Sequence, residues 1–207
     1  KLASVAAPRL PRPHGHPPPF PFNIPARAER QDDMKTILIW PKFESFSFWN
    51  FEKVCEVVGV KYMTPPLGLL TVAALLPQGW ELRLVDENVE PLTEADLKWA
   101  DLVMVGAKIV HRQRALDVVR WAKTLDKPVV VGGPDVTLNE DVYRRVGADY
   151  ICAGEGELTI PELLGDLERG VSSGYYRPKS AKADLCKSPT PRFDLIKFGD
   201  YLYMGLQ

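Results

Sequence analysis

Two adjacent glycines, Gly132 and Gly133, have the position in this sequence that most strongly suggests a ligand site. They directly follow the apolar run 129–131 and precede Pro134. A β-branched run of this kind is typical of a strand buried on both faces, and parallel sheets bind ligands beyond the carboxyl ends of their strands. The absence of side chains would let a large ligand lie against the backbone. A tight turn that needs a positive φ explains the two glycines equally well on their own.

Other unusual residues fall at the expected ends of four further strands. Because carboxyl ends of parallel strands lie along one edge of a sheet, these residues are expected to converge. Small residues at three neighbouring ends indicate a broad, flat ligand that lies on backbone amides. No G-x-G-x-x-G or Walker sequence follows the first strand, which disfavours dinucleotide and nucleoside triphosphate binding. The four sets are Trp40-Pro41, Asp86-Glu87-Asn88, Gly106-Ala107-Lys108 and Gly154-Glu155-Gly156-Glu157.

The elements that would position these residues alternate between strands and helices. Apolar runs predict strands at 36–40, 81–85, 101–106, 128–133 and 148–153. Helices are expected over 67–76, from a capping box at Thr93, over 112–125, after an Asn139 cap, and from Thr159 to Gly170. This alternation predicts an α/β fold, namely a five-stranded parallel doubly wound sheet with the flavodoxin-like, Rossmann-like order 2-1-3-4-5.

The domain organisation follows from where this pattern begins and ends. Residues 1–33 are rich in proline and predict a disordered lead, with Met34 as the expected natural start. Residues 34–170 would form the domain, 171–191 a linker, and 192–207 the start of a further, truncated domain. The long connection after the first strand carries five aromatic residues, which predict a lid, a docking face or a satellite cluster. They are Phe43, Phe46, Phe48, Trp49 and Phe51.

Composition excludes several functional classes. The chain has 207 residues, of which 45% are hydrophobic and 26% charged, enough for one domain with a core. The formal net charge of -1 gives no electrostatic case for binding nucleic acid or an anionic membrane surface. No apolar run approaches the roughly 20 residues of a membrane helix, and the N-terminus lacks a signal-peptide core. Three irregularly spaced cysteines predict reduced thiols and a cytoplasmic location.

Four motifs occur in order along the chain: Pro65-Pro66-Leu67-Gly68-Leu69-Leu70, Val85-Asp86-Glu87-Asn88, Val131-Gly132-Gly133-Pro134 and Ala153-Gly154-Glu155-Gly156-Glu157. Together they resemble the N-terminal cobalamin-binding (B12-binding) domain of B12-dependent radical SAM proteins, over residues 34–207. The resemblance implies a flavodoxin-like Rossmann fold that holds a corrinoid above its strand ends. It also implies that Gly132 and Gly133 flank the nucleotide tail, while residues 106–108 and 154–157 line the same groove.

The candidate cofactor-binding residues come from these motifs and strand ends, and no catalytic or metal-ligating residue is assigned. Carboxylates at strand ends also cap helices and accept amide hydrogen bonds, so a structural role is favoured for them over acid–base catalysis. The candidates are Leu67, Gly68, Asp86, Asn88, Gly106, Ala107, Lys108, Gly132, Gly133, Pro134, Gly154, Glu155, Gly156 and Glu157.

Two features depart from the family pattern. The Asp-x-His-x-x-Gly sequence that supplies a cobalt ligand in other corrinoid proteins is absent, so the resemblance implies base-off cobalamin without a histidine ligand. His111 is the one histidine in the predicted folded region, and we expect it in the groove or on the surface. The chain also ends before the family's Cys-x-x-x-Cys-x-x-Cys, so the iron–sulfur cluster and SAM are expected only in a missing domain.

The leading hypothesis is a cobalamin-binding module of a B12-dependent radical SAM, methyltransferase-like enzyme. This fragment would be non-catalytic alone and would bind a corrinoid next to a radical SAM domain in cis or in trans, with no nucleic acid or membrane partner. The full enzyme would move a methyl group from methylcobalamin to an unreactive carbon. The alternatives are a cofactor-free flavodoxin-like interaction or regulatory domain, and a flavin-binding domain of the same topology.

Overall fold

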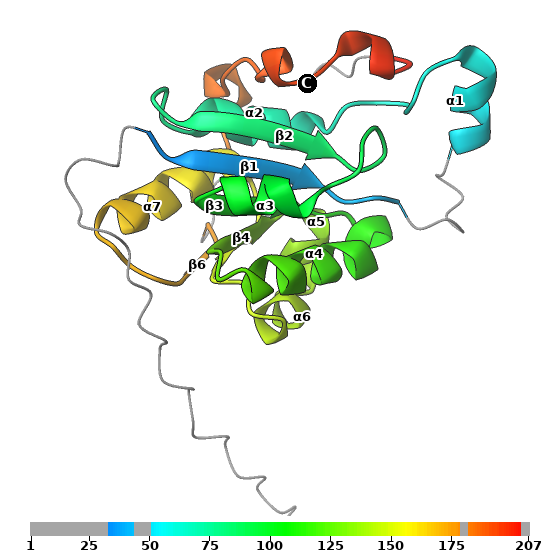
Figure 1. Ribbon diagram of the computed structural model, residues 1–207. Coiled ribbons are helices and arrows are strands. Elements are labelled where there is room, and N and C mark those ends of the chain that lie inside the picture. The colour runs from blue at the N-terminus through cyan, green and yellow to red at the C-terminus, as the bar shows by residue number, and fades with distance from the viewer. Residues whose placement is uncertain (1–32, 44–50, 179–181, 204–207) are drawn as a thin grey trace, which may run out of the picture.

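A parallel β-sheet of six strands lies at the centre of the protein, in a computed structural model that describes residues 33–43, 51–178 and 182–203. The strands stand in the order β2-β1-β3-β4-β5-β6 (Figure 1). Every neighbouring pair in this order is parallel. The strands are β1 (Lys35–Trp40), β2 (Glu81–Asp86), β3 (Leu102–Gly106), β4 (Val129–Gly132), β5 (Tyr150–Cys152) and β6 (Gly174–Tyr176).

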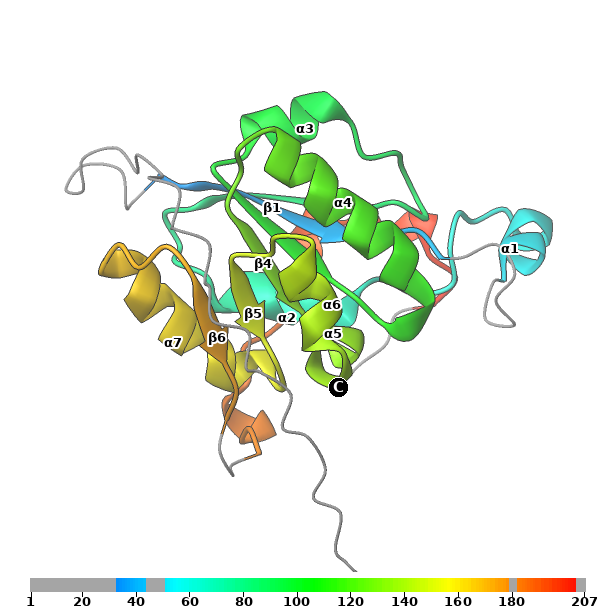
Figure 2. The ribbon, with the colours of Figure 1, turned by 90° about the horizontal axis from the view of Figure 1, so that it is seen from below.

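Helices cover both faces of this sheet. One face carries α3 (Glu94–Trp99), α4 (Arg112–Thr124), α5 (Pro134–Leu138) and α6 (Glu140–Arg145). The other carries α2 (Leu67–Leu75) and α7 (Gly156–Glu168), which pack against each other. Figure 2 shows the α3–α6 layer in front of the sheet. α1 (Glu52–Val58) stands apart from both layers, on the side where β1 ends (Figures 1 and 2).

The pleat of the strands explains why both faces are covered. In β1, Ile37 and Ile39 belong to the core beneath α3 and α4, while Leu38 and Trp40 belong to the core beneath α2 and α7. Successive side chains of a strand point to opposite faces, so an uninterrupted apolar run such as this one can be buried only between two layers. The described part of the chain contains no helix long and apolar enough to cross a lipid bilayer.

The predicted fold class is confirmed, with one correction to the strand count. The five predicted strands form with the predicted order 2-1-3-4-5, and β6 extends the sheet at the β5 edge. Its residues lie in the predicted linker, where only Gly174, Tyr175 and Tyr176 pair with β5. So short a strand leaves no periodic signal in a Gly- and Ser-rich segment, and pairing with β5 decides its structure.

Local boundaries also differ from the predictions. α5 begins at Pro134, immediately after the glycine pair, where only a turn is predicted. α7 begins at Gly156 and contains Pro161, whereas the sequence predicts a start at Thr159. α1 follows the aromatic connection and is not predicted at all. The proline-rich lead up to residue 32 and the loop aromatics Phe46, Phe48 and Trp49 lie outside the described residues.

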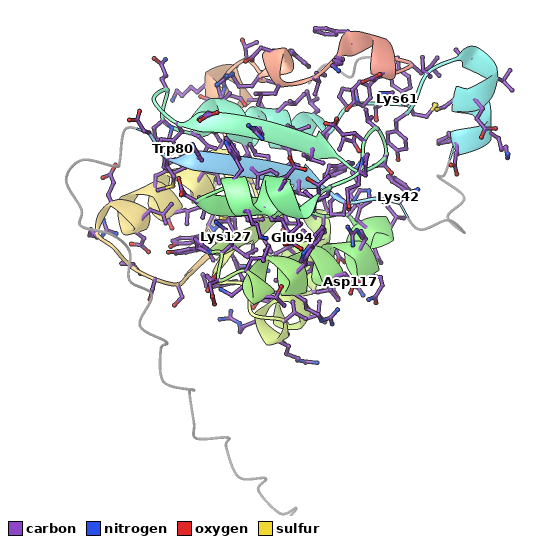
Figure 3. The ribbon with its side chains drawn as sticks, viewed as in Figure 1. Lys42, Lys61, Trp80, Glu94, Asp117 and Lys127 are labelled. Carbon is purple, nitrogen blue, oxygen red and sulfur yellow. The ribbon has the colours of Figure 1, made fainter. Side chains whose placement is uncertain are left out.

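The segment 192–203 covers one edge of the sheet near α2. The backbone N–H of Arg192 donates to the carbonyl of Leu70 at 3.0 Å, and residues 200–203 hydrogen-bond with residues 61–63. Lys61 Nζ and Asp200 Oδ1 are 3.1 Å apart, and Figure 3 shows Lys61 beneath this segment. These residues are predicted to begin a further domain, and here they pack on the sheet domain.

Thr93 and Asp96 form the capping box that the sequence predicts at the start of α3. The N–H of Asp96 donates to Thr93 Oγ1 at 3.2 Å, and the N–H of Thr93 donates to Asp96 Oδ2 at 3.0 Å. We expect Thr93→Ala to lower the free energy of unfolding by about 1 kcal/mol, because it removes one acceptor at the helix start. Urea unfolding measures this, and Thr93→Ser, which keeps the oxygen, should stay near wild type. Equal losses in both variants would contradict the capping role.

Candidate functional site

The carboxyl ends of four strands, β1, β3, β4 and β5, open into a groove of about 550 Å³. α2 and the first turn of α7 line it from one face of the sheet, and residues 62–66 line it from the connection before α2. The register places Gly106 of β3 beside Gly132 of β4, and Gly132 beside Cys152 of β5. The groove volume lies within the range of small-molecule sites, roughly 300–1,000 Å³.

Most of the predicted cofactor contacts line this groove. Asp86, Asn88, Ala107 and Glu155 are not among its lining residues, although Ala107 lies directly behind the glycine pair. Tyr62, Thr64, Val72 and Tyr203 line the groove without having been predicted, because no local pattern marks them. The predicted residues that do line it are Leu67, Gly68, Gly106, Lys108, Gly132, Gly133, Pro134, Gly154, Gly156 and Glu157.

Gly133 occupies a backbone conformation that only glycine adopts readily. Its φ is 103° and its ψ is 178°. A Cβ atom at this position would lie 2.8 Å from the carbonyl oxygen of Ala107. That oxygen accepts a hydrogen bond from the N–H of Asp135 at 3.1 Å, and the N–H of Ala107 donates to Gly132 at 3.0 Å. The turn after β4 is therefore locked against the exit of β3.

A buried carboxylate, Asp135, holds this turn from the other side. Its side chain accepts hydrogen bonds from Arg112 Nε at 2.9 Å, Tyr143 Oη at 2.7 Å and Asn139 Nδ2 at 3.1 Å. Burial alone would raise the pKa of Asp135, but these donors and the Arg112 charge hold it below its usual range. Asn139 precedes α6 as predicted, yet its side chain makes no cap bond and serves Asp135 instead. The sequence gives no signal that Arg112 and Asp135 meet.

Asp86 lies at the end of β2 behind the groove and is 2% exposed. Asn88 donates to its Oδ1 from the backbone N–H at 2.9 Å and from Nδ2 at 2.8 Å, and Tyr201 Oη donates to Oδ2 at 3.2 Å. Burial raises the pKa of this carboxyl to about 6, against the lowering effect of these hydrogen bonds. Glu87 beside it pairs with Arg114, whose Nε lies 2.9 Å from Oε2. Both carboxylates thus have structural partners.

His111 is fully buried, which corrects the prediction that it lies in the groove or on the surface. Its ring packs edge-on against Trp40 and Phe43, with centroid distances of 4.4 and 4.5 Å. Nδ1 accepts a hydrogen bond from the N–H of Lys108 at 3.2 Å, and Nε2 has no hydrogen-bond partner among the described residues. Burial lowers the pKa of His111 to about 4, so the ring is neutral at pH 7.

Lys108 and Glu157 are the charged side chains lining the groove in the described part of the chain. Lys108 Nζ lies 5.6 Å from the ring centroid of Trp40, close enough for a cation–π contact. Glu157 accepts a hydrogen bond from Ser188 Oγ at 2.9 Å. Cys152 lies at the groove as a buried thiol, and burial raises its pKa to about 12. The groove is therefore largely apolar, with one cation near its aromatic side.

A groove floored by glycine at the ends of a doubly wound parallel sheet defines a class of ligand-binding α/β domain. Comparison with known families assigns this chain within that class. Residues 55–164 match the B12 binding domain, so the chain belongs to that family. The recognition made from the four motifs is thereby confirmed at the level of the domain.

Curated relatives extend the comparison beyond the matched domain. An uncharacterized methyltransferase from Synechocystis sp. is 42% identical over 84% of this chain, and hopanoid C-2 methylase from Rhodopseudomonas palustris is 32% identical over 86%. A bacteriochlorophyllide d C-12(1)-methyltransferase from Chlorobaculum tepidum is 24% identical over 78%. The alignments cover 32%, 34% and 33% of these proteins, so the chain spans about a third of their length.

The glycine pair allows a direct test of the close approach between β3 and β4. We expect Gly133→Ala to lower the free energy of unfolding by at least about 2 kcal/mol, from backbone strain and the contact with Ala107. Gly132→Ala should cost less than about 1 kcal/mol, because its Cβ would lie 3.4 Å from the nearest atom, the Cys152 carbonyl oxygen. Chemical denaturation measures both variants, and equal losses would contradict the distinction.

Asp86 gives a test in pH. Its pKa is about 6 in the folded protein against an ordinary value of 3.8, so the folded state binds more protons between these values. Stability contributed by this group therefore falls as pH rises from about 4 to about 6, by roughly 3 kcal/mol. Asp86→Asn should remove this fall, seen as the difference between variant and wild type in urea unfolding across that range. The exposed Asp117→Asn should keep it; an unchanged slope in Asp86→Asn would contradict the assignment.

Proposed function

We propose that this chain is the cobalamin-binding module of a B12-dependent radical SAM, methyltransferase-like enzyme. The observation that carries the proposal is the bare floor that Gly106, Gly132 and Gly133 give to an apolar groove at the strand ends. Membership of the B12 binding domain family favours a corrinoid over a flavin as the ligand. The names of the relatives support methyl transfer as the reaction of the whole protein.

The residues present fit a corrinoid in size and chemistry. The glycine floor and α2 would hold it by backbone approach and apolar contact, and Lys108 would offer a cation to its phosphate or amide groups. Methylcobalamin, when bound, supplies a transferable methyl group. The residues of this chain bind and orient the corrinoid and exclude water from one side of it, and we assign none of them a proton transfer.

We also propose that the cobalamin is bound base-off and receives no histidine ligand from this chain. His111 supports this, because its Nδ1 already accepts the Lys108 amide hydrogen and its ring lies between Trp40 and Phe43. A neutral imidazole ligates a metal through a free nitrogen lone pair. With Nδ1 acting as acceptor, Nε2 carries the proton, so ligation would require both a new tautomer and a movement of the ring.

The proposed organisation of the full-length protein places the chemistry elsewhere. Residues 34–170 form the cobalamin domain, 171–191 connect it, and 192–207 begin a radical SAM domain that binds the iron–sulfur cluster and SAM in cis or in trans. The chain length, about a third of that of the relatives, supports this arrangement. The three free cysteines, Cys55, Cys152 and Cys186, support a reducing compartment such as the cytoplasm.

An interaction domain is the second candidate, and α1 favours it. Val54, Val57 and Val58 are 46%, 88% and 53% exposed on this helix, which stands apart from the sheet. Exposed apolar residues gathered on one element are typical of a docking surface. The two candidates differ in one respect that can be measured, because only the module needs a corrinoid in the groove.

Titration with hydroxocobalamin tests the proposal. We expect visible absorbance to co-elute with the protein on gel filtration, and Gly132→Val to weaken binding at least about tenfold because its side chain would occupy the floor. Gly199→Val is the matched control, since a Cβ at Gly199 meets no atom within 4 Å and the residue lies outside the groove. A folded wild-type chain, checked by circular dichroism, that retains no corrinoid would overturn the proposal and leave the interaction domain.

A further inference from the structure

The groove has two chemically different halves. One, the aromatic half, is lined by Trp40, Phe43, Tyr62, Lys108 and Tyr203 and lies near the ends of β1 and β3. The other, the aliphatic half, lies between α2 and α7 over β3, β4 and β5. Its lining residues are Val72, Met104, Val130, Cys152 and Ile160.

The floor and wall of the aliphatic half lie close together. A Cβ atom on Gly106 would be 3.0 Å from Leu69 of α2, and one on Gly156 would be 3.0 Å from Val72. The helix therefore packs almost directly on the glycines, and Leu69 and Val72 limit the width of the slot. A slot of this kind admits a flat, compact group and excludes a wide one.

The hydroxyl groups of the aliphatic half are already used. Thr71 Oγ1 donates to the carbonyl of Leu67 at 3.0 Å, and Thr159 Oγ1 donates to the carbonyl of Glu155 at 3.2 Å. The Cys152 thiol is a weak donor. A ligand with polar edge atoms would therefore leave them without partners in this half, and a buried polar group without a partner is costly.

These constraints single out one part of a cobamide. The corrin ring is wide and is edged by amide groups, which do not suit a narrow apolar slot. The lower base is flat and bicyclic. Dimethylbenzimidazole has an apolar edge of methyl groups, whereas adenine presents an exocyclic amine and additional ring nitrogens that need partners.

We infer that the aliphatic half of the groove receives the lower base of the bound cobamide and selects a benzimidazole over an adenine. This inference rests on the proposed function, because it assumes that the groove binds a corrinoid. It identifies Val72, Met104, Cys152 and Ile160 as residues that determine specificity. The shape of the slot and the hydrogen bonds already made by Thr71 and Thr159 carry the argument.

Equilibrium dialysis of the full chain against three corrinoids tests the inference, with visible absorbance as the readout. The probes are cobalamin, the corresponding cobamide with adenine as lower base, and cobinamide, which lacks the nucleotide. We expect cobalamin to bind at least about tenfold more tightly than the adenine cobamide, because an apolar pocket disfavours unpaired polar atoms to this degree. Cobinamide should also bind at least about tenfold more weakly, since it leaves the slot empty.

A pair of variants links the preference to the aliphatic half. Val72→Gln adds an amide that can hydrogen-bond to adenine, while Val72→Met adds a side chain of similar length without one. We expect the ratio of cobalamin to adenine-cobamide affinity to fall at least about threefold in Val72→Gln relative to Val72→Met. Circular dichroism confirms that both variants fold. Gly199→Val should leave the ratio unchanged.

The outcomes separate this inference from the proposed function. If no corrinoid binds, the proposed function fails and the inference with it. If all three corrinoids bind with equal affinity, the module stands and the lower-base site is overturned. If cobalamin and the adenine cobamide bind equally, and both more tightly than cobinamide, the base enters the groove and the selectivity is overturned.

Discussion

The close approach of the β4 exit to the β3 exit is the constraint on which the site depends. Gly133 lies against the backbone of Ala107, with no space for a side chain between them. Two backbone hydrogen bonds, Ala107 N–H to Gly132 and Asp135 N–H to Ala107, fix the two exits to each other. The Asp135 carboxylate then ties the turn to α4 and α6 through Arg112 and Tyr143. The turn and the ligand floor are therefore the same structure, and choosing between them is unnecessary.

The opposite face of the sheet supplies the second boundary of the groove. α2 packs so closely that Leu69 meets Gly106 and Val72 meets Gly156. Because helix packing sets this distance, the width of the groove is a property of the core and not of a flexible loop. A change in the volume of the α2–α7 interface would consequently alter the ligand slot even where no groove residue is replaced.

Much of this arrangement follows from the sequence, since it rests on local signals. The uninterrupted apolar runs of β1, β3 and β4 predict a doubly covered parallel sheet, and parallel strands necessarily bring Gly106, Gly132 and Gly154 to one edge. The groove residues on α2 were found through the motif that begins at Pro65 rather than through chemistry. β6 was missed because its three residues are specified by pairing with β5.

The rest could not be predicted because it depends on contacts between residues far apart in the chain. Arg112 meets Asp135, and Tyr201 reaches Asp86 from the other end of the sheet domain. His111 illustrates the same limit. As a lone polar residue after a strand it suggested an accessible position, yet Trp40 and Phe43 enclose it and its ring nitrogen caps the turn that begins at Lys108.

The aromatic half of the groove shows why the matched family domain is not the whole site. Trp40, Phe43 and Tyr203 line the groove but lie outside residues 55–164. Tyr201 connects the last of these to the sheet through its hydrogen bond to the buried Asp86, and residues 200–203 hydrogen-bond to the 61–63 segment that forms one wall. Each of these buried polar contacts would be costly to leave unpaired, so they position the segment firmly. The strand ends supply the floor of the site, and the chain on either side of the family domain completes its wall.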